Sequence, residues 1–102
     1  MSADSAVDDA ILQRTRLRIL LLLKKADAPL YIEQIAQDVG ESSRLTAHHL
    51  EILEELGLLK SEFGIIKDAS RPIAGRFFET TKKADQALER LRMSIPEVSR
   101  ND

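Results

Sequence analysis

Apolar residues recur every three or four positions through the first half of the chain, which is the period of an amphipathic helix. A leading helix is expected from near Ser5, and Thr15 is the expected N-cap of a second helix that extends to Ala26. Pro29 lies just beyond that end and stops the helical pattern. The short segment 30–31, Leu30 and Tyr31, is predicted to be extended.

The next two apolar stretches predict a helix-turn-helix. A short helix over residues 32–39 ends at Gly40, a residue that suits the left-handed position after a helix. Ser42 or Ser43 caps a longer helix that extends to Leu56. A short helix, a tight turn and a longer helix form the pattern of this motif.

After Gly57 the apolar period changes from helical to alternating. Leu59, Ser61 and Phe63 fall on one side of a predicted strand. A second strand is expected from Ile73 or Gly75 to Thr80. The polar, proline-containing segment between them, 66–72, suits the tip of a protruding hairpin.

A final helix completes the pattern, with Thr80 or Thr81 as its cap. It is expected to end before Pro96, and its apolar face holds Ala84, Ala87, Leu88, Leu91 and Ile95.

The predicted fold class is mainly α with a small β-hairpin, in a winged helix-turn-helix arrangement. A chain of 102 residues has the length of one domain. Within a single domain over 1–102, we expect a leading helix or arm at 1–13, a winged-helix core at 15–81 and a C-terminal helix at 82–95.

Composition excludes several classes of protein. The absence of cysteine excludes disulfides, thiolate zinc sites and cysteine nucleophiles. The longest apolar run, 19–23, is too short to span a bilayer, and the acidic N-terminus lacks the basic start of a secretion signal, so a cytoplasmic location is expected. Neither a phosphate-binding glycine loop nor a serine–histidine–acid arrangement is recognisable, so no enzyme is expected.

The net charge of −2 is unusual for a DNA-binding domain, which must neutralise phosphates. The charge is unevenly distributed, however. Acid gathers at the N-terminus, whereas basic residues outnumber acidic ones between Lys60 and Arg92.

Three segments carry a resemblance to a known family: 13–20 (QRTRLRIL), 40–50 (GESSRLTAHHL) and 53–59 (LEELGLL). Over about residues 13–84 the chain resembles the ArsR-type winged-helix transcription regulators. The resemblance implies a double-stranded DNA partner, the hairpin as wing, and a homodimer built from the first and last helices. The natural apolar contacts of that dimer are Ala10, Ile11, Leu88 and Leu91.

The chain departs from the family pattern at two positions. Ala84 stands where a glycine is typical after the wing, and Glu41 stands where an apolar residue is common after the turn glycine. Metal-sensing members use cysteines in the helix-turn-helix or His and Asp pairs in the terminal helix. This chain has neither, so no metal and no cofactor is expected.

The longer helix of the motif has two distinct faces at about 100° per residue. The face expected to be buried holds Leu45, Thr46, His49, Leu50, Ile52, Leu53 and Leu56. The face expected to be free holds Ser43, Arg44, Ala47, His48, Glu51 and Glu54, with Glu55 beside them.

Recognition helices place their N-terminal residues against base edges in the major groove. Arg44 suits guanine, Ala47 suits a thymine methyl group, and Ser43 suits a phosphate or a base edge. The hairpin cations would follow the DNA backbone or enter the minor groove. The predicted DNA-binding residues are Ser42, Ser43, Arg44, Ala47, His48, Lys67, Arg71 and Arg76. The alternative for these side chains is a solvated helix face and a soluble loop.

Two other groups have competing interpretations. His49 lies at the centre of the apolar face, so a packed and hydrogen-bonded histidine is favoured over a metal ligand, and His48 points elsewhere. The basic cluster could reach phosphate or pair with nearby acids; it comprises Arg14, Arg16 and Arg18, with Asp8, Asp9 and Asp38 as the available partners.

The sequence thus predicts a sequence-specific regulator of transcription that binds double-stranded DNA. The alternative is a winged-helix module for protein–protein interaction, in which Glu51, Glu54 and Glu55 meet a protein. An isoelectric point of about 5.7 motivates that alternative. An effector between the dimer helices is compatible with the first hypothesis, and no residue identifies one.

Overall fold

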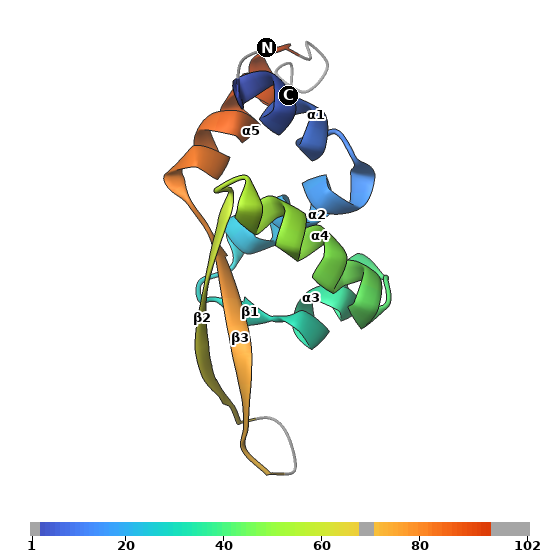
Figure 1. Cartoon of the computed structure of the whole chain (residues 1–102), viewed down its shortest axis with the longest axis vertical. Helices are drawn as coiled ribbons and strands as arrows, with labels where there is room; N and C mark the ends of the chain where they lie inside the picture. The colour runs from blue at the N-terminus through green and yellow to red at the C-terminus, as the bar shows by residue number, and fades with distance from the viewer. Residues whose placement is uncertain (1–2, 68–70, 95–102) are drawn as a thin grey trace.

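The structure is a computed structural model of the whole chain, and it describes residues 3–67 and 71–94. Helices gather into a body, and a long hairpin projects from it (Figure 1). Within the described ranges the order of elements is α1, α2, β1, α3, α4, β2, β3 and α5. The winged helix-turn-helix arrangement expected from the sequence is confirmed.

The two N-terminal helices are α1 (Ala3–Ile11) and α2 (Arg14–Lys25). The break between them is capped by Gln13, whose side-chain oxygen accepts a hydrogen bond from the Arg16 amide at 2.8 Å. The prediction of Thr15 as the cap was wrong, because Thr15 already lies in the first turn of α2 while Gln13 has the extended backbone of a cap. Arg16 Nε also donates to the Ala10 carbonyl at 2.8 Å, which ties the end of α1 to α2.

The helix-turn-helix forms where the sequence predicts it. Helix α3 (Ile32–Val39) ends at Gly40, which has a φ of 74° and donates from its amide to the Ala36 carbonyl. Helix α4 (Ser43–Glu55) begins after Ser42, whose hydroxyl oxygen accepts a hydrogen bond from the Leu45 amide at 3.1 Å. The left-handed residue turns the chain sharply, and the serine cap fixes the start of α4 directly after the turn.

The sheet has one more strand than the predicted hairpin. Strands β2 (Leu59–Ile66) and β3 (Ile73–Thr80) form the antiparallel hairpin, hereafter the wing. The extended segment β1 (Leu30–Tyr31) adds to the other edge of β3, which gives the order β1-β3-β2. Ile66, expected in the tip, belongs to β2, and tip residues 68–70 lie outside the described residues.

The last helix, α5 (Lys82–Ser94), is anchored by its cap. Thr81 Oγ1 accepts a hydrogen bond from the Ala84 amide at 3.3 Å and donates one to the Gly57 carbonyl at 2.6 Å. The turn after α4 and the start of α5 are therefore held together. The predicted apolar position at Ile95 and the stop at Pro96 lie outside the described residues.

The core lies between the helices and the base of the sheet. Most of the predicted buried face of α4 is confirmed, since Thr46, His49, Leu50 and Leu53 are all buried. Leu45 is exposed, contrary to expectation, because it lies about 90° around the helix from the centre of that face. The buried apolar side chains of the other elements include Ile19, Leu20, Leu23, Ile35, Val39, Leu58, Leu59, Phe78, Ala84 and Ala87.

Two of the four predicted dimer contacts are also part of this core. Ile11 and Leu88 are buried within the chain, because α1 packs against both α2 and α5. Large apolar side chains exposed at this end include the neighbouring Leu12, which is 60% accessible, and Met93 of α5, which is 70% accessible. Ala10 and Leu91 are half-buried. None of the helices in the described part of the chain is long and apolar enough to cross a membrane.

Replacing Leu50 with Ala should lower the free energy of unfolding by about 2–5 kcal/mol, since it leaves a cavity beneath α4. Urea unfolding followed by circular dichroism measures this loss. The matched control is Leu45→Ala on the same helix, which should cost less than about 1 kcal/mol because Leu45 is exposed. Equal losses in the two variants would contradict the observed orientation of α4.

Candidate nucleic-acid interface

Helix α4 presents a polar stripe on the side opposite its buried leucines. Arg44, His48 and Glu51 are exposed, and Ala47 between them is half-buried. The first two lie in the N-terminal turns of the helix, where a recognition helix meets base edges. Arg44 makes no hydrogen bond or ion pair with any residue of the described ranges. Its guanidinium is therefore available to a partner.

The start of α4 offers backbone donors beside this stripe. Ser42 uses its hydroxyl oxygen to accept the Leu45 amide, and its hydroxyl proton remains free to donate. The amides of Ser43 and Arg44 belong to the first helical turn, which has no carbonyl partners of its own. Both serines are exposed. These groups and the helix dipole together suit a phosphate oxygen.

The wing carries two exposed cations near its tip. Lys67 directly follows β2, and Arg71 lies two residues before β3. Both are exposed, at the end of the hairpin that projects from the helical body (Figure 1). The structure thus brings Ser42, Ser43, Arg44, Ala47 and His48 together on α4, and it places Lys67 and Arg71 apart from them on the wing.

Arg76, the third predicted wing cation, is turned toward α4 instead. Its Nη2 donates to Glu54 Oε1, and its Nη2 and Nε contact Ser61 Oγ at 2.8 and 3.3 Å. The guanidinium also lies 5.0 Å from the centre of the Phe78 ring. The expectation that Arg76 follows the DNA backbone stays a prediction, and in this placement its charge is paired with a carboxylate of the same chain.

Glu54 is correspondingly withdrawn from the free face on which the sequence placed it. Ser61 donates a hydrogen bond to Glu54 Oε2 at 2.6 Å. This bond, followed by the hydrogen bond and charge of Arg76, lowers the pKa of Glu54 below its usual value. The ionised carboxylate therefore joins the C-terminal part of α4 to both strands of the wing.

His49 is buried in the apolar face of α4, as predicted. Burial, and then the positive charges of Arg16 and His48, lower its pKa, while Glu41 opposes the shift. Nδ1 of His49 has no hydrogen-bond partner among the described residues, so the predicted hydrogen bond is not formed at that nitrogen. His48 lies on the exposed side, with the two ring centres 5.6 Å apart.

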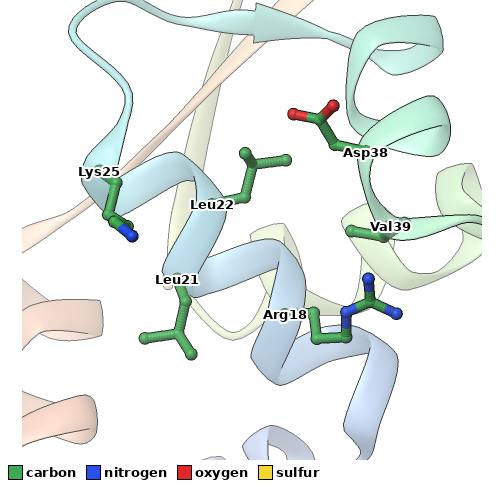
Figure 2. A pocket seen from close by; sticks show the side chains of 6 residues that line it. All are labelled: Arg18, Leu21, Leu22, Lys25, Asp38 and Val39. Carbon is green, nitrogen blue, oxygen red and sulfur yellow. The ribbon is translucent and has the colours of Figure 1, made fainter.

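The basic residues near the start of α2 take different roles. Arg16 bonds to the Ala10 carbonyl, and Asp8 pairs with Arg90 of α5 at 3.0 Å rather than with an arginine of α2. Arg18 and Asp38 line the same shallow pocket between α2 and α3 (Figure 2). No ion pair joins those two side chains within 4.0 Å. Arg18 is exposed at this pocket, so its guanidinium can contact a partner.

Comparison with known proteins bears on this geometry. The family model described as "Bacterial regulatory protein, arsR family" matches residues 13–61, which run from the cap of α2 into β2. The match covers slightly less than half of the 102-residue chain. The matched segment contains the whole helix-turn-helix, including the Gly40 turn and the stripe that begins at Arg44.

A solved structure matches the fold over most of the chain. The solution structure of a homodimeric winged helix-turn-helix DNA-binding domain from Mycobacterium bovis, a possible ArsR-family transcriptional regulator, matches with a TM-score of 0.69. The two sequences are 18% identical, and the match covers 90% of this chain and 77% of that one. No curated protein matches the chain in sequence. Most of this chain thus has a known structural counterpart in fold.

Sequence reasoning missed the contact that ties the wing to α4. Glu54 follows Ala47 by two helical turns and shares its stripe, so it was assigned to a partner. Its real partners come from β2 and β3, at 7 and 22 residues' distance along the chain. The alternation of β2 placed Ser61 beside Phe63 and Leu59, but nothing in the sequence states which strand residue faces α4.

Lowering the pH should destabilise this protein through His49. Its folded pKa lies below the ordinary value, so the unfolded chain binds the proton first. Stability from this group is complete above about pH 6.5 and is lost as the pH falls below it, by at most about 1.4 kcal/mol per pH unit for one proton. Urea unfolding between about pH 7.5 and pH 5.5 measures the slope.

The comparison that isolates His49 is between His49→Gln and His48→Gln. The first variant removes the buried ionisable group and should flatten the slope, whereas the second should keep the wild-type slope because His48 is exposed. Identical slopes in all three proteins would contradict the assignment.

Proposed function

We propose that this protein is a homodimeric regulator of transcription of the ArsR type that binds double-stranded DNA sequence-specifically. The observation that carries the proposal is the outward stripe at the N-terminal end of α4, where Arg44 has no ion-pair or hydrogen-bond partner among residues 3–67 and 71–94. An exposed arginine at that position of a helix-turn-helix suits the guanine edge in the major groove.

The contacts divide into two kinds. Arg44, with Ala47 and His48 beside it, would read bases in the major groove. Ser42, Ser43 and the wing cations would hold phosphates and fix the position of α4 without reading sequence. Glu51 and Glu55 lie one turn or more further along α4, so only the N-terminal part of the helix suits entry into the groove.

The dimer is supported by the surface that α1, α2 and α5 leave open. Two adjacent hollows share Leu91: one includes Leu12, just after α1, and the other includes Leu17 and Leu21 of α2. Leu12 and Leu21 are both exposed large apolar side chains. The Mycobacterium bovis domain of the same fold is homodimeric. A two-fold axis through this surface would place two α4 helices in successive major grooves, about 34 Å apart on a roughly palindromic site.

Replacing Arg44 with Ala should weaken binding to a selected duplex by about 1–3 kcal/mol and relax the preference for its sequence. Replacing Arg71 with Ala should weaken binding to all duplexes alike and reduce the salt dependence, because a phosphate contact carries no sequence information. Fluorescence anisotropy at several salt concentrations, on selected and scrambled duplexes, measures both effects. Absence of duplex binding at low salt in the wild type would disprove the proposed function.

Replacing Leu12 with Glu should convert the dimer to monomer, since the dimer would have to bury an unpaired carboxylate. Sedimentation velocity measures the change. Ile73→Glu supplies the control, because Ile73 is an exposed isoleucine on the wing and its replacement should leave the dimer intact. A Leu12→Glu variant that remains dimeric would place the subunit contact elsewhere.

A further inference from the structure

The wing has a face that is turned away from α4, and the strand register defines it. Cross-strand partners share a face, and neighbours along a strand alternate between faces. Ser61 and Arg76 bind Glu54 of α4, so their face of the wing is the one that meets α4. The residues of the opposite face, which we call the outer face, are Lys60, Glu62, Gly64, Ile66, Ile73, Gly75, Phe77 and Glu79.

A hollow of about 330 Å³ crosses the sheet on this side. Its lining comes from Phe77 and Glu79 of β3, from Glu62 and Phe63 of β2, and from Pro29 just before β1. Phe63 borders it from the edge of the sheet, since β2 is an outer strand. The hollow thus combines two aromatic rings with two carboxylates.

The ring of Phe77 is held in place on the sheet. It packs edge-on against Tyr31, its partner in β1, with the ring centres 5.6 Å apart and the planes at 77°. It also lies over Gly64, where an added Cβ would come within 2.9 Å of a ring carbon. A side chain at position 64 would therefore displace the ring. A ring fixed in this way offers a surface on which a cation can stack.

Phe63, in contrast, is bare. It is 80% exposed, the largest exposed fraction among the large apolar side chains of the described residues. Its ring contributes nothing to the core. Beside the half-buried Phe77 and the exposed Pro29, it forms an apolar surface of the kind that meets a partner.

The charges around the rings indicate a cationic partner. Glu62 is exposed and Glu79 is half-buried, and the side chain of neither forms an ion pair or hydrogen bond within residues 3–67 and 71–94. Lys60 is the cation of the outer face; it lies opposite Glu79 in the register, and its ammonium group has no carboxylate oxygen within 4.0 Å in the same ranges. Two carboxylates and one ammonium group leave this face negative. It therefore repels phosphate and attracts a cation.

The edge position of β2 favours a polypeptide as the source of that cation. One side of β2 pairs with β3, and the other has no strand partner within the described chain. Such an edge can pair with an extended segment of another protein. Since Glu62 and Phe63 belong to this strand, a segment beside it would carry its own side chains to the hollow. Arginine suits the hollow better than lysine, because a flat guanidinium stacks on a ring while it donates to a carboxylate.

We propose that the outer face of the wing binds a basic, extended segment of a partner protein, whose arginine side chain stacks on Phe77 and Phe63 and pairs with Glu62 and Glu79. This contact goes beyond the proposed DNA binding and does not depend on it. The site lies on the face of the wing opposite α4, so the segment leaves Arg44 free. One chain therefore binds a cationic partner on the outer face and a polyanion along α4 and the wing tip.

The experiment titrates the ¹⁵N-labelled full chain with the peptide acetyl-Thr-Arg-Thr-Arg-Thr-amide and follows the backbone amide signals by NMR. The amides of Glu62, Phe63, Gly64 and Phe77 should shift most. A second peptide carries citrulline in place of both arginines, which keeps the shape and removes the charge. It should bind about tenfold more weakly, because it loses the ion pairs and the attraction of a cation to the rings. Spermidine is the probe for a free amine.

Variants of the hollow test its residues one by one. Glu62→Gln and Glu79→Gln should each weaken binding of the arginine peptide about two- to fivefold, and the double variant about tenfold. Phe63→Ala should weaken it about two- to fivefold. The matched control is Glu55→Gln, which removes an exposed glutamate of α4 outside the hollow and should bind the peptide as the wild type does. The spread of the amide signals of each variant reports that it is folded.

Equal binding of the citrulline peptide would overturn the inference, as would an absence of shifts or an equal loss in Glu55→Gln. Spermidine that binds as tightly as the arginine peptide and shifts the same amides would also overturn it, because the hollow would then take a free amine. Duplex binding is measured separately, and Glu62→Gln should bind DNA at least as tightly as the wild type. Failure of the wild type to bind any duplex would remove the proposed function and leave this inference standing.

Discussion

The packing of one face of α4 against the other helices is the constraint on which the remaining geometry depends. Leu50 and Leu53 are buried together with Ile19 and Leu20 of α2, so α4 cannot rotate about its axis without exposing them. The opposite stripe, with Arg44 at its start, is turned outward as a consequence. The Gly40 turn and the Ser42 cap then fix where that stripe begins. An interface that reads bases needs this orientation, because a rotation of one residue would replace the arginine by a leucine.

The net negative charge of the chain is compatible with a surface that binds DNA, because several of its acidic residues form ion pairs within the chain. Glu54 neutralises Arg76 beneath the wing, Asp8 pairs with Arg90, and Asp85 lies 3.8 Å from Lys24. These acids are used inside the chain or at the helical end remote from the wing. Arg44, Lys67 and Arg71 stay free of such pairs among the described residues. The net charge therefore does not determine whether this surface can bind phosphates. The distribution of paired and unpaired charges does.

Local signals in the sequence predicted the elements well, and neighbours in space decided where those predictions were wrong. Gly40, Ser42 and Thr81 act at the helix ends where their chemistry placed them. Ile11 was assigned to a subunit contact because the sequence does not show that α5 packs over α1. The sequence also does not show that Glu54 lies beside Arg76 and pairs with it.

The sequence by itself determined the helix-turn-helix, its turn glycine and cap, and the inward direction of Leu50 and Leu53, because these follow from periodicity and from backbone preferences of single residues. It also placed Ser61 and Phe63 on one side of a strand. Only the tertiary structure decided that this side faces α4, that Arg76 is neutralised there, and that Phe63 is left bare beyond it. Those facts depend on contacts between segments far apart in the chain, and hydrophobic periodicity carries no information about which segments meet.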